Sequence, residues 1–120
     1  MTETQNPKRY DLEERTFKFA KRVRILVSKL TKTISNIEDG KQAVRSSGSI
    51  GANYIEANEA LSKKDFMMRI KICRKEAKET NYWLNLFDIN NTELENERKL
   101  LTKEASELTN IFGSIIRKSE

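Results

Sequence analysis

The stretch TELENERKLLTKEASELTNIFGSIIRK, residues 92–118, decides the fold class of this chain. Its apolar positions are Leu94, Leu101, Ala105, Leu108, Phe112 and Ile115. Intervals of three, four and seven residues place them on one face of an α-helix. Thr92 and Glu95 form the T-x-x-E capping box that opens many helices. The stretch therefore predicts a long amphipathic helix with one buried face.

Three further segments with helical periodicity lie upstream of this stretch. Asp39-Gly40 is a turn signal between the first and the second, and Ser62 with Asp65 forms a capping pattern before the third. Four amphipathic helices joined by short connections pack by default as an up-and-down bundle. We therefore predict an all-α, antiparallel up-and-down four-helix bundle. The predicted parts are a flexible segment 1–9 and a single domain 10–120, with helices at about 11–32, 41–61, 63–88 and 92–118.

The composition bears on several classes of function. The chain has 120 residues, with one proline, four glycines, one cysteine and no histidine. A single cysteine rules out an internal disulfide and a cysteine-based zinc cluster. The lack of histidine removes the commonest general base and the Ser-His and Cys-His pairs. We expect a protein that is not an enzyme and that needs no cofactor or metal.

The sequence also bears on location. No apolar run approaches the length of about 20 residues that a membrane-spanning helix needs. Residues 1–8 lack the apolar core of a secretory signal. We expect a cytoplasmic protein with no membrane partner.

The second segment is unusual for its many small residues. Glycine inside a helix costs about 1 kcal/mol relative to alanine, and close approach of a neighbouring helix would offset that cost. We therefore predict that Gly48 and Gly51 lie at helix contacts. A helix break at Ser47-Gly48 is the alternative. The small residues are Ala43, Ser46, Ser47, Gly48, Ser49, Gly51, Ala52, Ala57 and Ala60.

Polar residues of the second and third segments form one candidate site. A di-metal site in a bundle would require Glu-x-x-His pairs, and the chain has no histidine. We expect instead a polar network, within a subunit or between subunits, with Arg45, Arg69 or Arg74 as counter-charges. Such a network would fix helix register and oligomer geometry. Its candidate members are Arg45, Ser49, Gly51, Asn53, Glu56, Glu76, Glu79 and Trp83.

Cys73 and the aromatic residues have two possible roles. Cys73 and Trp83 fall at helical spacing among apolar residues, so we expect both to pack in the core. Tyr54, Tyr82 and Trp83 could alternatively stack on bases, although aromatic residues at such spacing are usually part of a core. Tyr10 is a further candidate for such contacts.

The net charge of +5 is unevenly distributed. Residues 8–32 carry nine basic and three acidic residues, and residues 63–78 carry seven basic and two acidic ones. Residues 92–120 carry five basic and six acidic residues. This asymmetry favours an anionic partner for the first and third helices, with solvated lysine-rich faces as the alternative. The candidate nucleic-acid contacts are Lys18, Lys21, Arg22, Lys29, Lys63, Lys64, Lys71, Lys75 and Lys78.

Two motifs carry a resemblance to a known family. Residues 45–57, RSSGSIGANYIEA, resemble its R-x-x-x-S-I-x-A-N-x-x-E-[GA] core motif. Residues 76–84, EAKETNYWL, are similar to its third-helix signature. The family is the four-helix-bundle or 23S rRNA intervening-sequence protein family of bacteria. The chain departs from the commonest pattern at Gly51, where many relatives have proline.

The resemblance implies an up-and-down four-helix bundle that assembles as a homopentamer, with no known activity and no catalytic residues. A related branch, the accessory proteins of diversity-generating retroelements, forms basic pentamers that engage nucleic acid and a reverse transcriptase. Two hypotheses follow. In the first, the chain is a self-assembling module whose partner is RNA, DNA or a protein that processes nucleic acid. Alternatively, it is a structural or adaptor oligomer that binds another protein, and its charge serves only solubility.

Overall fold

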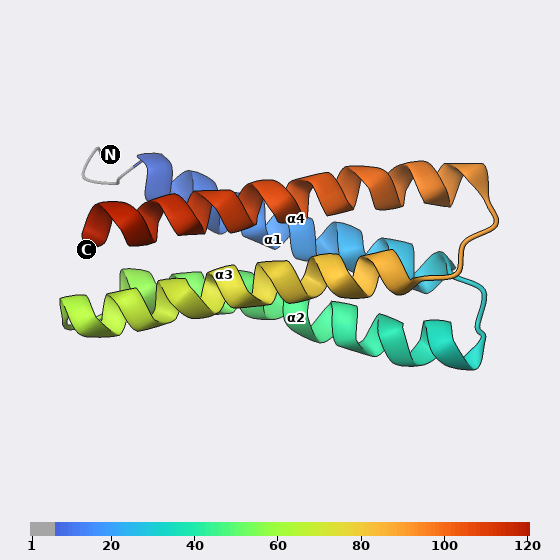
Figure 1. The fold of residues 1–120 in the computed structure, drawn as a ribbon, viewed down its shortest axis with the longest axis horizontal. Helices are drawn as coiled ribbons and strands as arrows, with labels where there is room; N and C mark the ends of the chain where they lie inside the picture. Colours follow the sequence, from blue (N-terminus) through green and yellow to red (C-terminus); the bar gives the residue numbers. More distant parts are fainter. Residues whose placement is uncertain (1–6) are drawn as a thin grey trace.

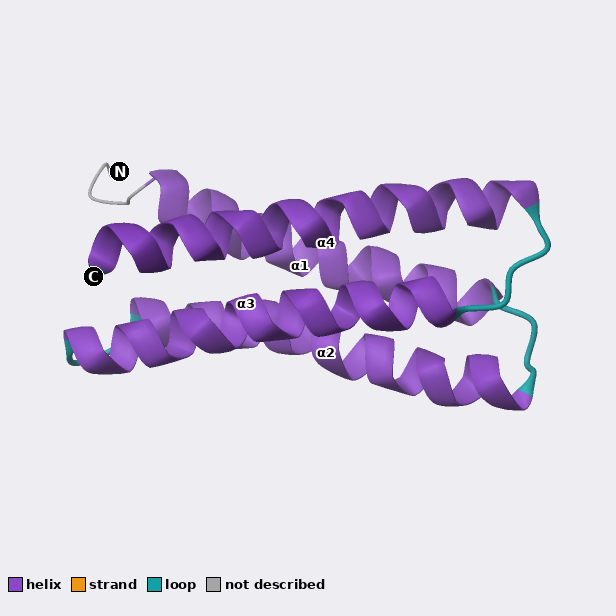
Figure 2. Cartoon of the chain, in the orientation of Figure 1, coloured by secondary structure: helices purple, strands orange, loops and turns teal. Residues whose placement is uncertain are grey.

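The chain forms four long α-helices joined by short connections. The computed structural model describes the backbone of residues 7–120 and the side chains of residues 11–120. The helices are α1 (Pro7–Lys29), α2 (Ile34–Asn58), α3 (Lys63–Leu86) and α4 (Thr92–Ser119) (Figure 1). No strand occurs within residues 7–120, and only connections separate the helices (Figure 2). The predicted all-α class with four helices is confirmed.

Consecutive helices run in opposite directions along the long axis (Figure 1). Helix α1 contacts α2 and α4, and α3 contacts the same two helices. In the described part of the chain, the backbones of α1 and α3, and those of α2 and α4, do not approach each other closely, although the rings of Tyr54 in α2 and Phe112 in α4 meet in the core. Helices α1 and α3 therefore lie diagonally across the bundle, and their outer faces point in different directions.

The core runs along the bundle axis and takes apolar side chains from every helix. Its periodic positions in α4, Leu101, Ala105, Leu108 and Phe112, are fully buried as predicted. Each fully buried side chain of leucine or phenylalanine size contributes about 1.5–3 kcal/mol relative to an exposed one. The other large, fully buried apolar side chains include Val23, Leu26, Ile50, Ile70 and Leu84.

Helix α2 begins at Ile34, earlier than the predicted residue 41. Thr33 is its N-cap, and the Thr33 side chain accepts a hydrogen bond of 3.1 Å from the Asn36 amide. Gly40 lies inside the helix, where an added Cβ would meet Val27 Cγ1 at 2.9 Å. This glycine therefore permits close packing of α1 against α2 and does not form the turn that the Asp39-Gly40 pair suggested.

The other helix ends differ less from the sequence prediction. Ser62 caps α3 and accepts a hydrogen bond from Asp65 N, as predicted. The cap of α4 is Asn91, one residue before the predicted Thr92. Residues 1–6 of the predicted flexible segment 1–9 lie outside the described residues, and residues 7–9 belong to α1, which begins at Pro7. Proline suits that position because its missing N–H would have no helical partner.

Candidate nucleic-acid interface

Four of the predicted lysines form a row on the outer side of α3. Lys64, Lys71, Lys75 and Lys78 are all exposed. Their spacing of four, seven, eleven and fourteen residues places them on one helix face. None of them makes an ion pair with any residue in the described region. Their charges are therefore available to an external anion.

The same face carries two large, exposed, uncharged side chains. Met68 is 50 % exposed and Tyr82 is 60 % exposed. Tyr82 lies four residues after Lys78 and seven after Lys75, so it continues the row. We call the set Lys64, Met68, Lys71, Lys75, Lys78 and Tyr82 the α3 face. Lys63, also a predicted contact, is exposed at the first residue of α3 but lies off this face.

The predicted basic face of α1 is partly neutralised. Lys18 pairs with Glu14 at 3.3 Å, and Arg22 pairs with Glu97 of α4 at 3.2 Å. Lys21 and Lys29 are exposed. Neither of these two lysines makes an ion pair among the residues described. The α1 surface thus offers fewer unpaired charges than the α3 face.

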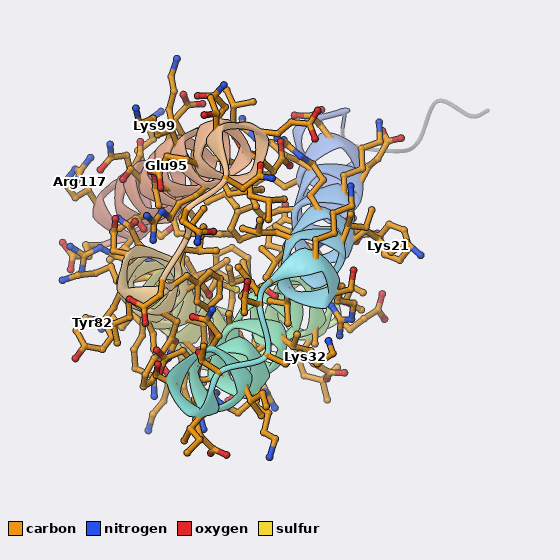
Figure 3. All side chains as sticks on the ribbon, turned by 90° about the vertical axis from the view of Figure 1, so that its right-hand side faces the viewer. Lys21, Lys32, Tyr82, Glu95, Lys99 and Arg117 are labelled. Atoms are coloured by element: carbon orange, nitrogen blue, oxygen red, sulfur yellow. The ribbon has the colours of Figure 1, made fainter. Side chains whose placement is uncertain are left out.

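The two basic surfaces point away from each other. Figure 3 shows Lys21 of α1 and Tyr82 of α3 extending outward on opposite sides of the bundle. The diagonal placement of α1 and α3 explains this separation. Within one chain, the predicted contacts of the first and third helices therefore form two separate surfaces.

Arg45 of α2 bonds two of the predicted polar residues of α3, and a third, Trp83, bonds one of these two. Its guanidinium donates to Glu76 Oε1 at 3.3 Å and also to Glu79 Oε2. The Trp83 indole Nε1 donates to the same Glu79 oxygen at 2.8 Å. Burial opposes ionisation of Glu79, but hydrogen bonds from Trp83 and Arg45 and the charges of Arg45 and Lys75 hold its pKa below the ordinary value. Glu79 therefore stays ionised and orients the indole ring.

A second polar group lies further along the contact between α2 and α3. Arg69 Nη1 donates to Asn53 Oδ1 at 2.9 Å. Asn53 Nδ2 in turn donates to the carbonyl and hydroxyl oxygens of Ser49 at 2.9 and 3.0 Å. The predicted single network is therefore two groups within one chain. Arg69, which completes this group, is one of the arginines expected as counter-charges.

Two of the predicted network members lie elsewhere. Gly51 faces α1, where an added Cβ would meet Thr16 Oγ1 at 2.9 Å. This is the close helix contact that the sequence predicted. Glu56 is exposed, and its side chain makes no hydrogen bond or ion pair with residues 11–120. It is not part of either group within the chain.

Cys73 packs in the core, as predicted. It is fully buried, and its Sγ donates to Ile50 O at 3.4 Å. Burial raises the pKa of the thiol to about 12, so it stays protonated at neutral pH. Trp83 packs partly buried against the same core, also as predicted.

Tyr82 completes the α3 face and is one of the aromatic residues for which the sequence left base stacking open. Its ring lies against Trp83 in an edge arrangement, with centroids 5.1 Å apart and an interplanar angle of 74°. Its interval from Lys75 and Lys78 was visible in the sequence and places it on the lysine row. The structure adds that the ring is exposed while Trp83 is partly buried.

Two other kinds of site are absent from the described part of the chain. In the described part of the chain, no three His, Cys, Asp or Glu side chains lie so that they could hold a metal ion. None of the helices described is long and apolar enough to cross a membrane. The α3 face, where four aligned lysines make no ion pair in the described region, is therefore the candidate site.

The structure defines an all-α protein of four packed helices with a basic outer face. Residues 8–114 match the family described as 23S rRNA-intervening sequence protein. The chain belongs to this family.

A solved structure agrees with that assignment. The chain is similar to a protein of unknown function from the S23 ribosomal protein family of Bacteroides thetaiotaomicron, with 31 % identity and a TM-score of 0.77. The similarity covers 92 % of this chain and 98 % of the other. A search of curated proteins found no match.

Proposed function

We propose that the chain is a self-assembling, non-catalytic protein that binds the phosphate backbone of nucleic acid through the α3 face. The observation that carries this proposal is the row of four exposed lysines on one side of α3 without ion pairs in the described region. A face of this kind, spread over about 20 Å of helix between Lys64 and Lys78, suits a polyanion better than a single small anion.

The expected binding mode is electrostatic and independent of base sequence. Lysine side chains that contact phosphates release condensed counterions, and affinity then falls as salt rises. For four contacts to a single strand, the slope of log K against log salt is about −2.8. Affinity should then fall about 50-fold between 50 and 200 mM salt.

Self-assembly is supported by apolar side chains that the isolated chain leaves exposed. Phe17 and Ile25 on α1 are 64 % and 52 % exposed, and Ile55 on α2 is 50 % exposed. Burial of such side chains against another copy would be favourable. We propose the homopentamer that the family resemblance implies. Each pentamer would present five copies of the α3 face, so binding would gain from avidity.

The adaptor function remains a second candidate, because the same exposed apolar side chains favour it. Phe17, Ile25 and Ile55 lie on helices other than α3. A protein partner that covered them would leave the α3 lysines in solvent. The two functions therefore differ in which substitutions reduce binding.

Paired lysine substitutions test the proposal. Lys71→Gln/Lys75→Gln removes two charges four residues apart on α3, and Lys99→Gln/Lys103→Gln removes two exposed charges with the same spacing on α4. We expect the α3 variant to weaken RNA binding and to reduce the magnitude of the salt slope by about 1.4. The α4 variant should bind as the parent does. Equal losses in the two variants would show that only net charge matters and would contradict the proposal.

A further inference from the structure

Tyr82 provides an exposed aromatic ring in line with the lysine row. The ring is 60 % exposed, although its neighbour Trp83 is partly buried against the core. An exposed tyrosine at the end of a row of lysines places an aromatic surface where a bound phosphate backbone would continue. In Figure 3 the Tyr82 side chain extends away from the bundle.

The Tyr82 ring also packs against another side chain of α3. It meets Trp83 edge-on at 5.1 Å between centroids. Trp83 is anchored by its hydrogen bond of 2.8 Å to Glu79, and Arg45 of α2 holds Glu79 in turn. This chain of contacts connects the ring to a second helix. A ring that is ordered before binding loses less conformational entropy when a ligand packs against it.

We propose that the α3 face binds single-stranded nucleic acid, with a base stacked on Tyr82 and phosphates on Lys71, Lys75 and Lys78. A duplex keeps its bases paired and stacked on each other, so their faces are closed to a protein ring. An unpaired strand exposes a face of every base, and aromatic side chains next to basic ones are the usual way to bind it. In this arrangement Trp83, Glu79 and Arg45 are positioning residues. The inference rests on the proposed function and adds the kind of strand to it.

Stacking predicts a larger effect than a surface substitution normally has. Loss of one stacked base weakens binding of a single strand by about 5-fold to 150-fold. Tyr82→Leu removes the ring and keeps an apolar side chain, so we expect that loss for an unpaired oligonucleotide and less than about two-fold for a duplex. Tyr82→Phe keeps the ring and should bind like the parent.

The experiment titrates the assembled protein with an unpaired pyrimidine oligonucleotide of RNA and with the same strand in a duplex. Trp83 is the single tryptophan of the chain, so its fluorescence reports directly on the neighbouring Tyr82 ring. We expect the unpaired strand to bind more tightly and to change Trp83 emission, and the duplex to leave the emission nearly unchanged. This readout uses the parent protein and does not depend on any variant.

The outcomes separate this inference from the proposed function. Tyr82→Leu binding that equals the parent's, or unchanged Trp83 emission on saturation with the single strand, would overturn the stacking assignment. If Lys71→Gln/Lys75→Gln still weakened binding in that case, the proposed function would stand without the stacking assignment. Absence of binding to both oligonucleotides would overturn both.

Discussion

Replacing Gly51 by alanine tests the close contact between α1 and α2. An added Cβ would lie 2.9 Å from Thr16 Oγ1 and 3.3 Å from Thr16 Cβ. Thr16 is fully buried, and its Oγ1 donates a hydrogen bond of 2.7 Å to Leu12 O, so a shift of this side chain would disturb that bond and the packing around it. Overpacking of this kind costs about 1–3 kcal/mol, and alanine recovers about 1 kcal/mol of helix propensity. We expect Gly51→Ala to lower the free energy of unfolding by about 1 kcal/mol.

Gly48→Ala is the matched control, three residues earlier in the same helix. Its added Cβ would meet Arg24 Nη2 at 3.3 Å, which is the far end of a flexible, exposed side chain. The guanidinium can move aside, so the gain in helix propensity should dominate. We expect Gly48→Ala to raise the free energy of unfolding by about 0.5–1 kcal/mol.

Urea denaturation followed by circular dichroism measures both variants. The protein concentration must be the same throughout, because assembly would add to the apparent stability. The account predicts opposite signs for the two glycines and a difference of about 2 kcal/mol. If Gly51→Ala were as stabilising as Gly48→Ala, the argument that Thr16 requires glycine at position 51 would be refuted.

Three further predictions concern buried or paired side chains. The pKa of Glu79 is lowered in the folded protein, so the stabilising effect of its charge is present at neutral pH and disappears as the pH falls through and below about 4.5. Melting curves should show that Glu79→Gln loses part of this acid dependence. The control Glu56→Gln, at an exposed residue, should keep it. Cys73 should react with a thiol reagent at pH 8 only as fast as the protein unfolds, since burial raises its pKa to about 12, and reaction at the rate of a free thiol would contradict its place in the core. Asn36→Ala should lower the free energy of unfolding by about 1–3 kcal/mol in urea denaturation. The side-chain amide of Asn36 donates to the Asp88 carbonyl and accepts from the Asp88 N–H, and so joins two connections. A loss below about 0.5 kcal/mol would contradict that role.

The periodic apolar positions made the fold class predictable from sequence. Leu101, Leu108 and Phe112 are buried where their spacing placed them, because only one face of a helix can meet the core. The start of α2 was not predictable in the same way. Gly40 occurs in a turn-like dipeptide, but a glycine is needed there because the Val27 side chain of α1 lies close to it. A contact between two helices gives no signal in the sequence next to Gly40.

The candidate site was predictable in composition more than in arrangement. Lysines were identified on both α1 and α3, but sequence cannot show that Arg22 is paired with Glu97, 75 residues away. Nor can it show that the two helices lie diagonally. The polar network was predicted as one set because Asn53 and Glu79 lie on neighbouring segments. In the fold they belong to different groups, each held by its own arginine.

The most direct test of the central claim is a salt titration of RNA binding by the parent protein. A fluorescent single-stranded RNA is titrated with folded, assembled protein at 50 and 200 mM salt, and the slope of log K against log salt is measured. The account predicts binding that weakens about 50-fold over this range, as expected for four lysine–phosphate contacts to a single strand. Absence of binding at 50 mM salt would contradict the account and would direct attention to a protein partner on the exposed apolar surfaces of α1 and α2.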